Sequence, residues 1–450
     1  MEIHSNRSVP KVSYRRSGVI LTLFAGWSAV LGFALDAIIA AVVGAGRTYD
    51  VFVGASAIPA LLVAILATPL SVALVPRLQS QRAVSSNSSW SLGRYVTFVS
   101  VLAAIGLVII LAIAADGIVT KALPGFAGSS LHLAKVIFLI SLLTFAFQSL
   151  VLVMSAVLNT HERFTVPGIL PALNGVFMVA FAIAFASRWS VIGLAAAYAA
   201  SAGIQVLILF LAFRQGRHAR EKNVDPTVIR SVLRNASSLM IAGVAYNGMA
   251  VIDRYYGSRL PAGSLSHLAY ASRLGMAFAN IIAAGVSAPL LTRLAGAAAR
   301  RDEKDFSRTI TIAVTALATV VVPALAVAAG TGDIGVAMLL RRRHFTMEDS
   351  SATALALLAY IPAIVVMVVG RPIIFAFHAL SDFTTPVWLN SMSLMMYGTL
   401  AFFVLGKLHA GYLGLACIWS AVHILLLVGF CIRLRAKAPI AWRPDRKSVV

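Results

Sequence analysis

The chain has 450 residues, of which 60% are hydrophobic and only 12% are charged. Soluble domains carry about 25% charged residues, so this composition excludes an ordinary soluble enzyme and predicts a protein that lies mostly in lipid. The net charge of +21 would suit nucleic acid, but its distribution, described below, follows the sides of a membrane instead, and we expect no nucleic-acid partner.

The apolar runs of the chain predict about twelve transmembrane helices, since a bilayer crossing needs roughly 20 apolar residues. The first run is too long for a cleaved signal peptide, and a second follows almost at once. No connection exceeds roughly two dozen residues, which leaves no room for a folded domain outside the membrane. The predicted spans are 18–43, 52–75, 95–115, 132–158, 166–187, 190–213, 235–257, 266–292, 309–330, 352–378, 386–405 and 410–434.

Most Lys and Arg residues fall on one side of the membrane if residues 1–17 are cytoplasmic. This positive-inside bias predicts a multi-pass protein of the bacterial cytoplasmic membrane with both termini in the cytoplasm. The run Arg341-Arg342-Arg343 is an exception because it falls on the outer side. Its simplest interpretation is an interfacial anchor.

The two halves of the chain repeat one another. Asp36 and Asp253 lie 217 positions apart, each in an apolar helix. Other pairs at similar spacing are Ala55-Ser56 with Ala271-Ser272, Arg77-Leu78 with Arg293-Leu294, 164–167 with 383–386, and 193–195 with 414–416. Six helices per repeat give both halves the same orientation, as in many transporters. We therefore predict an all-α polytopic membrane protein of two parallel six-helix repeats: an N-lobe at 1–213, a cytoplasmic basic linker at 214–234, a C-lobe at 235–434 and a cytoplasmic tail at 435–450.

Known catalytic motifs are missing from the sequence. It has no Gly-x-x-x-x-Gly-Lys-Ser/Thr loop, and His161-Glu162-Arg163-Phe164 lacks the second histidine of a zincin helix. Cys417 and Cys431 cannot form a zinc site alone. We expect a transporter rather than an enzyme, with no cofactor and no metal site.

Charged residues within the predicted spans are the candidate site. An ionised group at mid-bilayer costs on the order of 2.5–3.5 kcal/mol, so it usually faces a bundle interior or a cavity. Asp36 suits a cation or proton site, or a gate between the lobes. The alternative is that it is an ordinary carboxylate that lies near the lipid headgroups. Asp253 and Arg254 lie near the outer end of the seventh span, where snorkelling is the rival explanation.

Two arginines lie deeper in the predicted spans. Arg273 suits a bidentate grip on a phosphate or pyrophosphate, and the alternative is a structural ion pair with Asp253. Arg371 precedes Pro372, which predicts a kink in the tenth span.

A series of short motifs runs along nearly the whole chain. They lie at 28–36, 50–52, 58–59, 159–174, 253–254, 263–266, 270–274, 345–346, 371–376 and 382–386. Together they resemble the lipid II flippase (MurJ/MviN) family of the MOP exporter superfamily, whose fold is MATE-like. The resemblance implies an alternating-access carrier that moves a polyprenyl-(pyro)phosphate-linked glycan across the membrane. It implies substrate contacts by Arg273, Asp36, Arg254 and Arg371, and cation coupling by Asp253.

The chain departs from the family pattern in its N-lobe. Ala29, Leu35 and Val63 stand where the family has arginines, and the basic segment 433–450 stands where the family usually continues into two further helices. Three interpretations remain open. The first is a flippase for lipid II or an exopolysaccharide precursor, the second is a transport-inactive scaffold that binds glycan-synthesis enzymes, and the third is a drug or cation antiporter.

Overall fold

The structure, a computed structural model, describes residues 27, 30–214 and 226–437. The predicted basic N-terminal tail, most of the predicted linker and the predicted tail from residue 438 lie outside the described residues. Ala29, one of the positions at which the family has an arginine, lies outside them as well.

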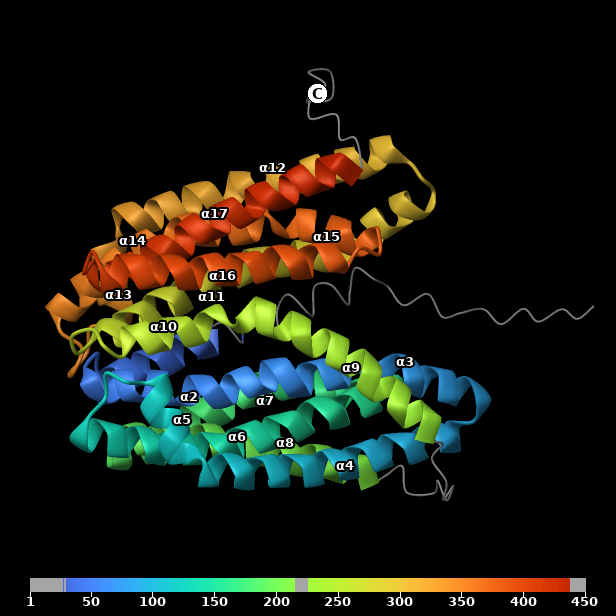
Figure 1. Cartoon of the computed structure of the whole chain (residues 1–450), viewed down its shortest axis with the longest axis horizontal. Coiled ribbons are helices and arrows are strands. Elements are labelled where there is room, and N and C mark those ends of the chain that lie inside the picture. The colour runs from blue at the N-terminus through green and yellow to red at the C-terminus, as the bar shows by residue number, and fades with distance from the viewer. Residues whose placement is uncertain (1–26, 28–29, 215–225, 438–450) are drawn as a thin grey trace, which may run out of the picture.

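The N-lobe is helical throughout its described part. It contains a helix at Val30–Val42, then α2 (Arg47–Leu62), a π-helical turn η1 (Val63–Ala67), α3 (Thr68–Val84), α4 (Ser86–Ile113), α5 (Ala115–Ala122), α6 (Gly128–Thr160), α7 (Thr165–Phe181), a second π-helical turn η2 (Ala182–Ala186) and α8 (Ser187–Arg214). In Figure 1 these elements, coloured blue to green, form the lower lobe.

The C-lobe is helical in the same way. Its elements are α9 (Pro226–Asn247), α10 (Met249–Gly257), α11 (Ser264–Ala299), α12 (Glu303–Gly330), α13 (Gly332–Leu340), α14 (Met347–Val369), α15 (Arg371–Ala379), α16 (Thr384–Gly406) and α17 (Gly411–Lys437). In Figure 1 the elements from α11 onward form the upper lobe, and α9 crosses from one lobe to the other.

Eight continuous helices among the described residues are long and apolar enough to cross a membrane. One of them, Thr165–Arg214, contains both the fifth and the sixth predicted spans. Ser190 breaks it with a φ of 50° and a ψ of −129°, and α7 packs back against α8. This segment is therefore a helical hairpin, as its two predicted spans require.

The seventh and tenth predicted spans are each interrupted. The seventh is split at Gly248 into α9 and α10, a break that its apolar pattern does not predict. The tenth is interrupted at Gly370, directly before Arg371-Pro372, which is where the sequence predicts a kink. The short helices α5 and α13 were also missed, because each is too short to give a transmembrane signal.

Among the described residues, the buried apolar side chains form three clusters, and their distribution shows how the lobes meet. The largest cluster joins both lobes through residues such as Ile39 and Val51 on one side and Leu265 and Tyr270 on the other. A second cluster lies in the N-lobe with Val232 of α9, and a third lies within the C-lobe. The lobes therefore share one core at the end where α2 meets α10 and α11, and have separate cores at the opposite end.

Candidate functional site

The shared end of the lobes is held by Asp50 in the first turn of α2. Its carboxylate accepts hydrogen bonds from the backbone N–H groups of Gly263 and Ser266, both at 2.7 Å, and from the Ser266 hydroxyl at 2.6 Å. Gly263 has a φ of 90° at the start of α11, so a turn exposes the free N–H groups of this helix, which favour an anion. Asp50 is 1% exposed, and it joins the N-lobe to the C-lobe.

Arg47, one turn before Asp50, makes a second connection between the lobes. Its Nη1 donates to the carbonyl oxygens of Ser258 at 3.3 Å and Leu260 at 3.4 Å. The backbone N–H of Gly125 also donates to the Ser258 hydroxyl at 3.2 Å. We call the contacts of Arg47, Asp50 and Gly125 with residues 258–266 the latch. The site prediction missed it, although Asp50 and its partners lie in two of the motifs named from the sequence, 50–52 and 263–266.

An ion pair between Arg273 of α11 and Asp36 of the helix at Val30–Val42 connects the two lobes. The Arg273 Nη1 lies 3.1 Å from the Asp36 Oδ1 and also donates to the Tyr49 hydroxyl at 3.1 Å. Tyr49 stacks on Tyr270 with ring centroids 4.8 Å apart, and the Tyr270 hydroxyl donates to the Gly44 carbonyl. Two of the predicted site residues are therefore brought together across the lobe interface.

The partner of Arg273 differs from the structural alternative that the sequence suggested. That alternative paired Arg273 with Asp253, whereas the structure pairs it with Asp36, the repeat equivalent of Asp253 in the other lobe. Asp253 instead accepts a hydrogen bond from the hydroxyl of Tyr397 in α16. It is 5% exposed, so the two related carboxylates occupy separate sites.

Arg254 and Arg371 lie apart from one another in the fold. Arg254 follows Asp253 in α10, and its buried Nε has no hydrogen-bond partner among the described residues. Arg371 begins α15, which packs against α11 and belongs to the half of the C-lobe away from the latch. Each is half-buried.

The described residues contain no group of three or more His, Cys, Asp or Glu side chains that could hold a metal ion. Arg273 at the lobe interface and Asp253 within the C-lobe offer two kinds of chemistry. The guanidinium of Arg273 can bind an anion if Asp36 is displaced, and the carboxylate of Asp253 can bind a cation or a proton.

Comparisons with known proteins agree with this arrangement. The sequence model of the family described as lipid II flippase MurJ matches residues 39–444. A probable lipid II flippase MurJ of Haemophilus influenzae is 28% identical over 94% of this chain and 86% of that protein. One of Vibrio cholerae is 24% identical over 91% and 83%.

Solved structures show the same fold. A lipid II flippase MurJ in an inward closed conformation has a TM-score of 0.80 at 19% identity, covering 93% of this chain and 87% of that one. An inward-facing multidrug transporter of the MATE family has a TM-score of 0.71 at 15% identity, covering 94% and 96%. These structures confirm the predicted all-α, MATE-like membrane fold, and the match of the family model over most of the chain shows that the protein belongs to the lipid II flippase MurJ family.

Proposed function

We propose that this protein is an alternating-access flippase that moves a polyprenyl-(pyro)phosphate-linked glycan, either lipid II or an exopolysaccharide precursor, across the cytoplasmic membrane. The observation that carries the proposal is the Arg273–Asp36 ion pair, which bridges the lobes at a depth where charges are usually functional. Membership of a family of transporters, rather than enzymes, supports the same reading. The names of the relatives favour lipid II as the substrate.

The pair gives Arg273 two alternative anionic partners. In this conformation its guanidinium is held by Asp36 while the latch joins the lobes. A pyrophosphate that enters between the lobes competes with Asp36, because a guanidinium binds phosphate oxygens in the same bidentate geometry as a carboxylate. Substrate binding would thereby loosen a contact between the lobes and favour separation at the latch. Arg254 and Arg371 are further candidate contacts for the anionic head.

The positive-inside bias assigns the latch to the outer face of the membrane and the end with separate cores to the cytoplasm. The conformation is then closed at the outer face, and opening at the cytoplasmic end would admit a substrate made in the cytoplasm. Both termini would be cytoplasmic. Asp253 is our candidate for cation coupling, since a buried carboxylate with a single tyrosine donor would bind a cation without disturbing the Asp36 pair.

Substitutions at the arginine positions favour a second candidate, a scaffold that binds glycan-synthesis enzymes without transport. Leu35 and Val63 are apolar, so the N-lobe has fewer cations for a pyrophosphate than the family pattern. If the protein is a scaffold, the Arg273→Ala variant should restore the function that is lost when the gene is deleted. If the protein is a flippase, this variant should fail to restore it.

Transport by the purified full chain tests the proposal directly. The protein is reconstituted into vesicles with fluorescently labelled lipid II, and translocation is measured by chemical reduction of the label on one leaflet. We expect wild type to translocate and Arg273→Ala to lose most activity. Arg188→Ala serves as the control, because Arg188 is an exposed arginine outside the lobe interface. Absence of translocation, or equal activity of wild type and Arg273→Ala, would contradict the proposal.

The same assay with a labelled exopolysaccharide precursor separates the two substrate classes. Rescue of cells depleted of their lipid II flippase would assign lipid II. Failure of rescue together with translocation of the other glycan would assign an exopolysaccharide precursor.

A further inference from the structure

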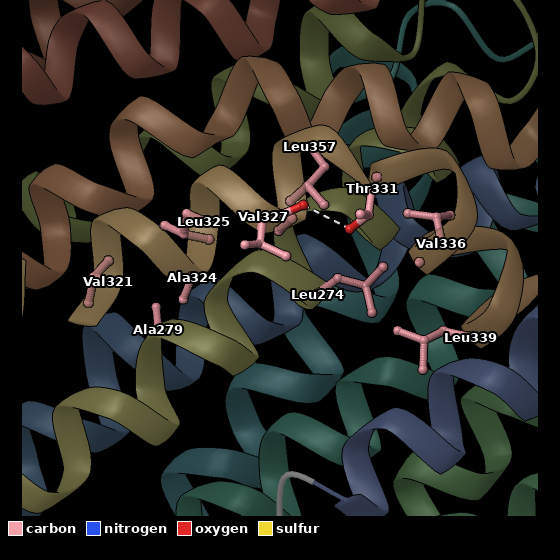
Figure 2. A pocket seen from close by; sticks show the side chains of 13 residues that line it. Leu274, Ala279, Val321, Ala324, Leu325, Val327, Thr331, Val336, Leu339 and Leu357 are labelled. Atoms are coloured by element: carbon pink, nitrogen blue, oxygen red, sulfur yellow. Dashed lines mark hydrogen bonds between the residues drawn. The ribbon is translucent and has the colours of Figure 1, made fainter. Parts of the chain in front are cut away.

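An apolar pocket lies in the C-lobe between α11, α12, α13 and α14 (Figure 2). Its volume is about 280 Å³, nearly twice that of a cavity of about 150 Å³ that takes up benzene. The residues that line it include Leu274, Ala279, Leu325, Val336, Leu339 and Leu357. Neither Asp36 nor Arg273 belongs to this lining, so the pocket is separate from the charged site between the lobes.

The pocket offers few hydrogen-bonding groups to an occupant. Among the described residues of the lining, Thr331 carries the one polar side chain, and its hydroxyl already donates to the Val327 carbonyl at 2.8 Å, the dashed line in Figure 2. Water in such a pocket would lack polar partners, so the favoured occupant is a hydrocarbon chain.

The two helices α12 and α13, which line the pocket, also carry exposed side chains suited to lipid. Val327 on α12 is 65% exposed, and Ile334 and Met338 on α13 are 72% and 81% exposed. Exposed apolar side chains that lie close together in this way mark a surface that contacts the membrane. A Cβ added at Gly335, which lines the pocket, would meet no atom within 4 Å, so this side of the pocket is open.

Three arginines follow the pocket directly. α13 ends at Leu340, and Arg341, Arg342 and Arg343 come next, all exposed. Arg341 follows the pocket residue Leu339 by two positions, so their Cα atoms are at most about 7.6 Å apart. Within the described chain none of the three forms an ion pair, and Arg342 donates only to the Leu339 carbonyl. These residues are also the exception to the positive-inside pattern, so their positive charge calls for a ligand of its own.

We propose that the pocket and the Arg341–Arg343 run together bind one anionic phospholipid of the membrane. One acyl chain occupies the pocket, and the phosphate lies on the guanidiniums, which suit phosphate oxygens. A membrane phospholipid fits better than the tail of the transported substrate, because the lining includes the exposed Val327 and neither residue of the Asp36–Arg273 pair. The leaflet that holds this phospholipid follows from the membrane orientation given with the proposed function. The binding of the phospholipid does not depend on transport.

The test measures lipid retained by the full-length protein in detergent, using native mass spectrometry. Phosphatidylglycerol and phosphatidylcholine with identical acyl chains are the two probes. The head-group variant is Arg341→Gln/Arg342→Gln/Arg343→Gln, and its control is Arg301→Gln/Lys304→Gln/Arg308→Gln, which removes three exposed cations at the opposite end of α12. The pocket variant is Gly335→Phe, and its control is Gly330→Phe, since Gly330 also has open space around its Cβ but lies outside the lining.

We expect wild type and both controls to retain phosphatidylglycerol in preference to phosphatidylcholine. The head-group variant should weaken that preference by roughly fivefold for each arginine removed, and Gly335→Phe should lower retention of both lipids. Equal retention of the two lipids by wild type, or equal loss in variant and control, would overturn the proposal. Displacement of phosphatidylglycerol by equimolar polyprenyl phosphate would overturn it in favour of the substrate tail. If the wild-type protein prefers phosphatidylglycerol but does not translocate a lipid-linked glycan, the result counts against the proposed function and not against this lipid site.

Discussion

Asp36 and Asp253 occupy equivalent positions in the two repeats, yet their environments have diverged. Asp36 pairs with an arginine of the opposite lobe, whereas Asp253 accepts a hydrogen bond from Tyr397 within its own lobe. A carboxylate that faces a cation across an interface can take part in opening and closing, because its partner moves away when the lobes separate. A carboxylate that faces a tyrosine of its own lobe can gain or lose a proton or a cation without breaking a contact between the lobes. The duplicated fold therefore provides two separable carboxylate sites.

The sequence identified these carboxylates but not their partners. Asp36, Asp253 and Arg273 stand out because charges in apolar helices are costly. Which of them meet depends on how the lobes pack, and a residue pattern does not contain that information. Asp50 was missed as a site residue because it lies in the first turn of a helix, where a carboxylate is ordinary.

The Arg273–Asp36 pair leads to a prediction that separates stability from transport. Arg273→Gln alone leaves a buried carboxylate without its cation, and we expect a loss of about 3–5 kcal/mol of stability. Asp36→Asn in addition removes that unpaired charge, so the double variant should be more stable than Arg273→Gln. Thermal unfolding in detergent and vesicle transport, measured on both single variants and the double variant, check this.

The transport result decides what the pair does. If Arg273 binds the substrate anion, the double variant recovers stability but not transport, because the guanidinium is still missing. Recovery of both would show that the pair is structural and that the anion binds elsewhere.

At the scale of elements, the unpredicted feature is how α9 joins the lobes. It packs against α3 and η1 of the N-lobe and against α16 of the C-lobe. The predicted boundary at residue 235 falls within this helix, since hydropathy marks spans but does not show which lobe a span contacts. Gly243 permits the close approach: a Cβ there would lie 3.2 Å from the Ile65 Cα and 3.3 Å from the Ala64 carbonyl oxygen.

Gly243→Ala should therefore destabilise the protein. Both neighbouring atoms belong to the backbone of η1 and cannot rotate away, so we expect a loss of about 1–3 kcal/mol from overpacking. Gly106→Ala in α4 is the matched control, because a Cβ at Gly106 meets nothing within 4 Å; it should stabilise the protein by about 0.5–1 kcal/mol. Urea unfolding in the same detergent measures both. Equal effects of the two substitutions would show that α9 does not approach η1 this closely.

A contact between the end of α17 and the loop before α16 predicts a pH dependence. Partial burial alone would raise the pKa of Asp382, but hydrogen bonds from Lys437 and Thr385 and the Lys437 charge lower it to about 2 from an ordinary 3.8. A lowered folded-state pKa stabilises the fold above the unfolded pKa, and this contribution is lost as the pH falls from about 4 towards 2.

The stability difference between wild type and Asp382→Asn should accordingly be present at pH 6 and shrink below pH 4. Asp333→Asn is the control, since Asp333 is exposed and forms no ion pair among the described residues. Thermal unfolding across this pH range checks the prediction, and a difference that is independent of pH would contradict it.

At the scale of the whole molecule, the arrangement of the cores explains why the two ends behave differently. One core and the latch join the lobes at one end, and each lobe has its own core at the other. The sequence predicted two lobes, from its repeat, but it could not show which end is joined. That depends on side chains such as Asp50 and Ser266, 216 positions apart, meeting in one conformation.

The latch distinguishes a transporter from a scaffold, because only a transporter has to open it. Arg47→Cys and Leu260→Cys, at a side chain and a carbonyl that are in contact and at two half-buried residues, can be bridged by a short reducible thiol crosslinker after Cys417 and Cys431 are replaced by serine. Asp50 remains in place, so the lobes stay joined in the uncrosslinked protein. We expect crosslinking to abolish transport and reduction to restore it, with each single-cysteine protein unaffected by the reagent. Transport that continues at full rate in quantitatively crosslinked protein would mean that the latch end does not open, and the alternating-access mechanism would then be wrong for this protein.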